Sequence, residues 1–186
     1  MKILYIHGFG SHYDPTHEKI QELEKIGDVV GVDIDYYRGY ESAFATAHAA
    51  IKDNHIDLIV GTSMGGYLAA AVGTDAGIPF VALNPAIEPK TSLLKWEGSV
   101  VDYTGGQHYL TRAAIDSYPD IATTGAGLIL VESADEVIHA QTTVDTLSEF
   151  YQVKMFTGGS HRFTHMSAAL PIITEFYSRA SVSYES

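Results

Sequence analysis

Six short apolar runs alternate with helical patterns along most of the chain. The first run is continuously apolar rather than alternating, which is typical of a strand buried on both faces of a sheet. The runs cover residues 2–6, 28–34, 57–62, 79–84, 127–132 and 152–157. The helical patterns cover about 15–26, 41–53, 64–76, 110–117, 139–150 and 167–178. This alternation predicts an α/β fold, in which a mainly parallel six-stranded sheet has helices on both faces.

The first helix has clear boundary signals in the sequence. Asp14 is a suitable N-cap residue, Pro15 suits the first helical position, and Gly27 suits the end of the helix. Ile20, Leu23 and Ile26 mark one apolar face. We therefore expect the helix to begin directly after Asp14.

In an open parallel sheet, ligands bind at the carboxyl ends of the strands. Chemistry is therefore expected just after residues 6, 34, 62, 84, 132 and 157. The connection over residues 86–126 is unusually long and contains several aromatic residues. A connection of this length is either a small lid or cap over a site, or ordinary crossover packing. With 186 residues, the whole chain 1–186 is expected to form a single domain.

Charge and composition exclude several classes of function. Eleven basic residues against 23 acidic ones give a net charge of −12, with no basic cluster. Binding to nucleic acid or to an anionic membrane needs the opposite balance. The absence of cysteine excludes disulfides, thiolate catalysis and cysteine-ligated zinc. The first residues lack a signal peptide, and no apolar stretch is long enough to span a bilayer, so we expect a cytoplasmic protein.

The third strand ends in Gly61-Thr62-Ser63-Met64-Gly65, which matches G-x-S-x-G. In a nucleophile elbow the serine lies in a strained turn between strand and helix, and glycines on either side avoid collisions. The strand before Ser63 and the small-residue helix after it are the context that supports a nucleophile. The alternative is a phosphate-binding turn, but neither G-x-G-x-x-G nor a G-K-[ST] ending is present here.

A serine nucleophile needs a histidine base and an acid that orients the histidine. In this kind of fold the chain order is serine, then acid, then histidine. His161 comes just after the sixth strand, behind Gly158-Gly159, and is the candidate base. The loop after the fifth strand offers three acids: Glu132 within the strand, Asp135 at the turn, and Glu136. Asp135 is the candidate, although it could instead cap the following helix.

The spacing of His161 and His165 could in principle hold a metal. However, no HExxH motif or nearby carboxylate ligand accompanies the pair, so neither a metal nor another cofactor is expected.

An oxyanion hole requires two backbone N–H donors. Met64 follows the nucleophile directly, and Phe9 lies in the loop after the first strand, so their N–H groups are the candidates. The alternative for this loop is a turn with a buried aromatic residue. A further set of residues could form a substrate pocket at the same edge of the sheet: His7, Gly8, Arg38, Trp96 and Tyr103.

The ordered motifs HGFG, GTSMGG, ADEV and GGSHRF resemble those of the α/β-hydrolase superfamily, and more closely the small YqiA/YcfP-type esterases. The resemblance runs from residue 2 to about 178 and includes LNPAIEP after the fourth strand. It implies a minimal three-layer α/β-hydrolase fold with Ser63 as nucleophile, Asp135 as acid and His161 as base.

It also implies a serine carboxylesterase that cleaves small-molecule, short-chain acyl esters through an acyl-enzyme. A thioesterase, an amidase or a C–C hydrolase would use the same residues, and a non-catalytic ligand-binding protein could keep the fold. Neither the physiological substrate nor the oligomeric state follows from the sequence.

Overall fold

The structure is a computed structural model that describes residues 1–182. Its strands are β1 (Lys2–Ile6), β2 (Asp28–Val32), β3 (Leu58–Thr62), β4 (Phe80–Leu83), β5 (Gly98–Val101), β6 (Gln107–Leu110), β7 (Gly127–Glu132) and β8 (Gln152–Phe156). Its helices are α1 (Glu18–Leu23), η1 (Tyr36–Arg38, a 3₁₀ turn), α2 (Tyr40–Asn54), α3 (Met64–Ala76), α4 (Pro89–Leu94), α5 (Arg112–Asp116), α6 (Ala140–Leu147) and α7 (Met166–Val182).

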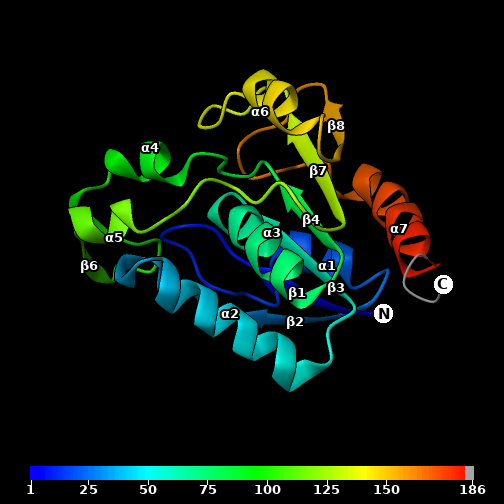
Figure 1. Ribbon diagram of the computed structural model, residues 1–186, viewed down its shortest axis with the longest axis horizontal. Helices are drawn as coiled ribbons and strands as arrows, with labels where there is room; N and C mark the ends of the chain where they lie inside the picture. Colours follow the sequence, from blue (N-terminus) through cyan, green and yellow to red (C-terminus); the bar gives the residue numbers. More distant parts are fainter. Residues whose placement is uncertain (183–186) are drawn as a thin grey trace.

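The six predicted strands form one sheet in the order β2-β1-β3-β4-β7-β8. Every neighbouring pair is parallel, which confirms the α/β prediction and makes this sheet fully rather than mainly parallel. Helices α1 and α7 pack on one face, whereas α2, α3 and α6 pack on the other, giving three layers (Figure 1).

Strand β1 shows why a central strand of this sheet is continuously apolar. Leu4 and Ile6 point to the core shared with α2 and α3, whereas Ile3 and Tyr5 point to the core shared with α1 and α7. Successive side chains of a strand alternate between faces, and both faces of this sheet are covered. A polar residue at any of these positions would be buried without water.

The first helix begins later than the sequence predicts. Asp14 is not its N-cap, because the Asp14 carboxylate accepts hydrogen bonds from the Thr16 N–H and hydroxyl and closes a separate turn. His17 caps α1 instead, its ring accepting from the Lys19 N–H. The helix also ends at Leu23, well before Gly27.

Strand β2 ends at Val32 rather than at residue 34. The Ile34 N–H leaves the sheet and donates to His7 Nε2 over 2.9 Å, so a side chain replaces the neighbouring strand as its acceptor. The apolar pattern of the sequence did not predict that a side chain would accept this hydrogen bond and end the strand at Val32.

The connection over 86–126 contains an element that the sequence analysis missed. Strands β5 and β6 form a separate antiparallel hairpin, between α4 and the expected helix α5. Asp102 organises its turn by accepting from the Thr104 and Gly106 N–H groups. The hairpin strands are short and mostly not buried, so they lack the apolar run that marks the other strands.

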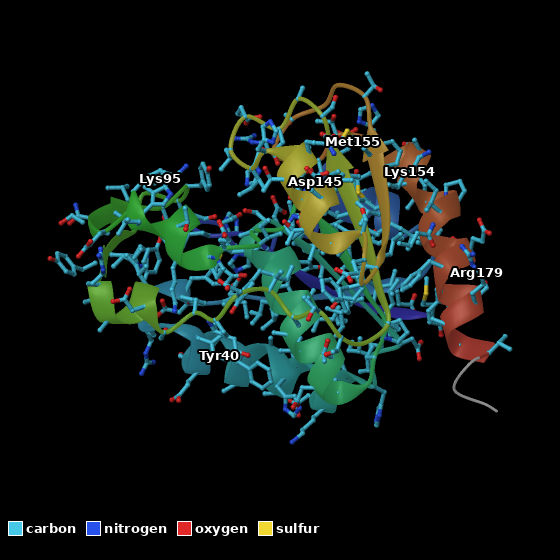
Figure 2. The ribbon with its side chains drawn as sticks, turned by 45° about the horizontal axis from the view of Figure 1, so that its top comes forward. Tyr40, Lys95, Asp145, Lys154, Met155 and Arg179 are labelled. Carbon is cyan, nitrogen blue, oxygen red and sulfur yellow. The ribbon has the colours of Figure 1, made fainter. Side chains whose placement is uncertain are left out.

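The connection over 86–126 and the edge strand β8 lie on opposite sides of the molecule. Figure 2 shows Lys95, which follows α4, on the opposite side from Lys154 and Met155 of the edge strand β8. The connection over 86–126 therefore extends the fold on the side away from β8. No helix within residues 1–182 combines the length and apolar character needed to cross a bilayer.

Candidate active site

Ser63 lies in the strained corner between β3 and α3. Its backbone has φ 58° and ψ −120°, a region that residues with a side chain rarely adopt. A Cβ on Gly65 would lie 2.0 Å from the Ile6 carbonyl oxygen, and one on Gly61 would lie 2.1 Å from the Gly65 carbonyl oxygen. Both flanking positions must therefore be glycine for the corner to form.

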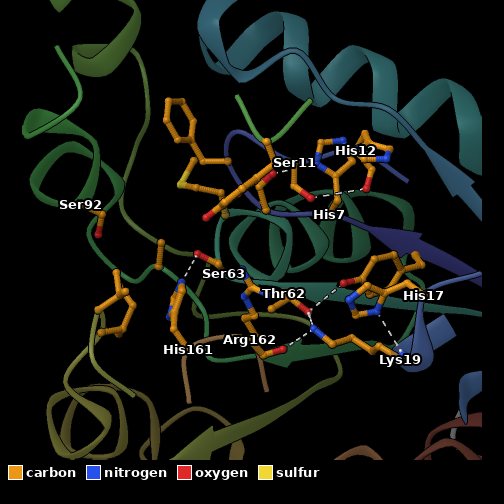
Figure 3. Close-up of a pocket in the computed structure, with 18 of the residues that line it drawn as sticks. His7, Ser11, His12, His17, Lys19, Thr62, Ser63, Ser92, His161 and Arg162 are labelled. Carbon is orange, nitrogen blue, oxygen red and sulfur yellow. Dashed lines mark hydrogen bonds between the residues drawn. The ribbon is translucent and has the colours of Figure 1, made fainter. Parts of the chain in front are cut away.

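Three side chains from three strand ends form a continuous chain of hydrogen bonds, of which Figure 3 shows the contact between Ser63 and His161. His161 Nε2 lies 2.8 Å from Ser63 Oγ, and His161 Nδ1 lies 2.9 Å from both carboxylate oxygens of Asp135. Ser63 follows β3, Asp135 follows β7 and His161 follows β8. Residues separated by 98 and 26 positions in the sequence thus meet at the predicted edge of the sheet.

The Asp135 side chain is 1% exposed and is held by its own loop. Its Oδ1 accepts from the N–H groups of Val137 and Ile138 at 2.8 and 2.9 Å. The alternative role as a helix cap does not apply, because His139 caps α6. The carboxylate is therefore fixed with both oxygens directed at His161.

The loop that carries His161 is anchored by a buried carboxylate. Glu132, at the end of β7, accepts from the N–H groups of Ser160, Thr164 and His165 and contacts the His165 ring. Its side chain is fully buried, and burial by itself would raise its pKa. These hydrogen bonds outweigh the burial and hold the Glu132 pKa below its ordinary value.

Asn84 ties the same loop to the end of β4. Its Nδ2 donates to the carbonyls of Ser160 and His161 at 2.9 and 3.2 Å, and its Oδ1 accepts from the Glu132 N–H. Its φ of 43° takes the chain out of the strand, one residue earlier than the sequence predicts. Sequence analysis did not assign Asn84 or Glu132 a role; a buried polar residue at a strand end was the available signal.

The loop after β1 is braced by His7, which is 2% exposed. His7 Nδ1 lies 2.7 Å from the Gly8 carbonyl oxygen, and its Nε2 accepts from Ile34, so the neutral form donates from Nδ1. Burial lowers the His7 pKa, which favours this neutral form. Because a trans peptide directs C=O and N–H oppositely, the brace on Gly8 also fixes the direction of the Phe9 N–H.

The Phe9 N–H has no acceptor among residues 1–182, and the Met64 N–H begins α3, where no carbonyl of the helix can accept from it. Both residues line a cavity of about 400 Å³ together with Ser63 and His161. Two N–H groups without an acceptor among residues 1–182 therefore belong to residues that line the same cavity as the hydroxyl. Their role as an oxyanion hole stays a prediction.

The cavity receives most of the predicted pocket residues. His7, Gly8, Trp96 and Tyr103 line it, the last two from the connection over 86–126. Arg38 does not line it and is exposed on η1. The structure thus leaves Arg38 outside the pocket in which the sequence analysis expected it, because η1 turns its side chain to solvent.

Several solved structures with a similar fold carry the names of esterases, lipases or other hydrolases. Est1E from Butyrivibrio proteoclasticus matches with a TM-score of 0.73 at 18% identity, covering 97% of this chain and 88% of that one. A monoacylglycerol lipase from Paleococcus ferrophilus matches with a TM-score of 0.69 at 16% identity, covering 95% and 94%. Likeness at such identities shows the fold alone, and the fold of this chain is the three-layer α/β-hydrolase fold.

The chain belongs to the uncharacterised protein family UPF0227, whose model matches residues 2–178. It is 25% identical over 181 residues to a UPF0227 protein of Shewanella oneidensis, covering 94% of this chain and 98% of that protein. A UPF0227 protein of Vibrio atlanticus is likewise 25% identical over 181 residues. The family is therefore established and the predicted fold class is confirmed, whereas the names of these relatives specify no reaction.

Proposed function

We propose that this protein is a serine hydrolase, specifically a carboxylesterase that cleaves short-chain acyl esters of small molecules. The observation that carries the proposal is the unbroken chain of hydrogen bonds from Ser63 through His161 to Asp135. The esterases and lipases among its structural neighbours support the reaction class. No cofactor is needed for this chemistry.

In the first step, Ser63 Oγ attacks the ester carbonyl carbon while His161 Nε2 accepts the hydroxyl proton. Negative charge then develops on the carbonyl oxygen. The Phe9 and Met64 N–H groups bind this oxygen, and the N-terminus of α3 adds a favourable dipole. Asp135 accepts from Nδ1 and stabilises the imidazolium that forms.

In the second step, His161 donates the proton to the leaving alcohol, and the acyl group stays on Ser63. Water then enters, His161 removes one of its protons, and the resulting oxyanion is held by the same two donors. Collapse of this intermediate releases the acid and restores the Ser63 hydroxyl. His161 takes one proton and passes it on in each half-reaction, from Ser63 to the leaving alcohol in the first and from water to Ser63 in the second.

The first test is the variant Ser63→Ala. We expect it to lower kcat/KM for p-nitrophenyl acetate by about 10⁴-fold or more, because the nucleophile is removed. Urea unfolding should remain two-state and native-like. Ser42→Ala, on α2 and outside the cavity, is the matched control and should keep wild-type activity.

Retention of wild-type activity by Ser63→Ala would refute the assignment. Matched ester, thioester and amide substrates in the same assay separate a carboxylesterase from a thioesterase or an amidase. Absence of turnover for every substrate, with a folded protein, would favour a ligand-binding role.

A further inference from the structure

One end of the cavity is cationic, although the whole chain has a net charge of −12. Lys19 and Arg162 line this end with His17 beside Lys19, and His12 also lines the cavity. The other end is apolar and is formed by residues of two loops, of the start of α3 and of the connection over 86–126: Phe9, Met64, Ala86, Leu93, Trp96, Val137 and Ile138. Ser63 lines the cavity together with both groups.

Lys19 is unusual because a charged side chain is 6% exposed here. Its Nζ donates to Thr62 Oγ1 over 3.1 Å and to the Arg162 carbonyl oxygen. These contacts use two of its three hydrogens. The negative charge of Glu132 acts on Lys19, but the Glu132 oxygens accept hydrogen bonds from the loop that carries His161.

Arg162 directly follows the proposed base and shares a wall of the cavity with Lys19 and His161 (Figure 3). Among residues 1–182, its guanidinium has no hydrogen-bond acceptor or ion-pair partner, although other arginines of the chain form ion pairs. A guanidinium presents paired donors that match a carboxylate or a phosphate. An unpaired arginine beside a buried ammonium group is suited to bind an anion.

The cavity contains one carboxylate, that of Asp14. Its Oδ1 already accepts from the Thr16 N–H and hydroxyl. Lys95 adds a third cation at the apolar end, where its Nζ lies 5.7 Å from the Trp96 ring centroid. The balance of charge within the cavity is therefore opposite to that of the whole chain.

We propose that the substrate is an anionic ester, whose carboxylate or phosphate group binds Lys19 and Arg162 on one side of the bond that is cleaved. The remaining apolar part packs against Phe9 and Trp96. This inference rests on the proposed hydrolase function and specifies its substrate class. Because Lys19 contacts Thr62, the neighbour of Ser63, the anion lies a short chain length from the ester carbonyl.

The test compares charged and neutral esters of similar size. In one arm the charge is on the acyl part of the ester, and in the other arm it is on the alcohol part. The acid arm uses p-nitrophenyl hydrogen glutarate against p-nitrophenyl valerate. The alcohol arm uses the butyrate esters of glycolate and of ethylene glycol phosphate against ethyl butyrate, and it separates carboxylate from phosphate. In at least one arm, we expect wild-type kcat/KM to favour the charged ester by about tenfold or more.

Arg162→Gln should reduce this preference by about tenfold while changing kcat/KM for the neutral ester by less than about twofold. Arg38→Gln is the matched control, since it removes the same charge outside the cavity and should keep the preference. A substitution that only disturbed the His161 loop would lower turnover of charged and neutral esters alike.

Equal use of charged and neutral esters by the wild type would overturn the inference and leave the proposed function standing. The same holds if Arg162→Gln lowers both kinds of turnover equally. Hydrolysis of no ester at all would overturn the proposed function, and the inference with it.

Discussion

At the scale of single residues, the proposed reactivity of Ser63 depends on groups that would not touch the ester. Asp135 orients the His161 ring. The side chains of Glu132 and Asn84 hold its loop by hydrogen bonds to backbone groups of His161 itself and of residues on either side of it in the sequence. A catalytic imidazole displaced by about 1 Å loses much of its effect. Glu132 and Asn84 are therefore positioning residues.

Glu132→Gln tests this positioning role. Gln can accept at only one side-chain oxygen, and its NH₂ group faces N–H donors, so we expect a loss of about 1–3 kcal/mol in the free energy of unfolding. We also expect kcat to fall about tenfold or more, with a smaller change in KM. Urea unfolding and steady-state kinetics measure the two effects. Glu41→Gln, on the exposed side of α2, is the control; equal behaviour of the two variants would contradict the role.

The same carboxylate predicts a dependence of stability on pH. Its pKa is lower in the folded chain than the ordinary value of 4.5, so its stabilising contribution is present above about pH 4.5 and is lost as the pH falls. The difference in unfolding free energy between wild type and Glu132→Gln should therefore shrink as the buffer is made more acidic. Urea titrations across this range measure it, and a difference that is constant with pH would count against the assignment.

At the scale of elements, the connection over 86–126 forms one wall of the cavity. The hairpin is joined to the loop after β1 by the Tyr103 N–H, which donates to the Gly10 carbonyl oxygen over 3.0 Å. The Trp96 ring lies 6.1 Å from the Phe9 ring, centroid to centroid. The aromatic residues that bound the apolar end thus come from two separate segments. That this connection moves as a lid remains a prediction.

Trp96→Ala should weaken the binding of apolar ester groups more than it slows chemistry. Loss of the aromatic contact is worth about 0.5–1.5 kcal/mol, so we expect KM for p-nitrophenyl butyrate to rise about two- to tenfold with kcat nearly constant. Tyr109→Ala, an exposed aromatic residue of β6 that does not line the cavity, is the control. An unchanged KM in Trp96→Ala would show that the ring does not bind substrate.

At the scale of the whole molecule, the sequence predicted the sheet and the three central residues because both have strong local signals. The six strands of the sheet each carry a short apolar run, and Ser63, Asp135 and His161 each follow one of these strands. The hairpin β5–β6 was missed because its strands are short and mostly exposed. The roles of Glu132, Asn84 and Arg162 depend on which strands are neighbours, which no local pattern encodes.

The boundaries of elements also depended on tertiary contacts. Helix α1 begins at its His17 cap rather than after Asp14 because Asp14 closes its own turn. Strand β2 ends early because His7 supplies an acceptor for Ile34. In both cases a side-chain acceptor overrode a plausible local signal.

The central claim is that Ser63 is an activated nucleophile, and covalent trapping tests it most directly. The folded protein is treated with a fluorophosphonate, and the labelled peptide is identified by mass spectrometry. We expect one phosphonyl group on Ser63, no label in Ser63→Ala, and much slower labelling in His161→Ala, which keeps the hydroxyl but lacks the base. A folded wild-type protein that takes up no label at Ser63, or one labelled equally fast without His161, would contradict the claim.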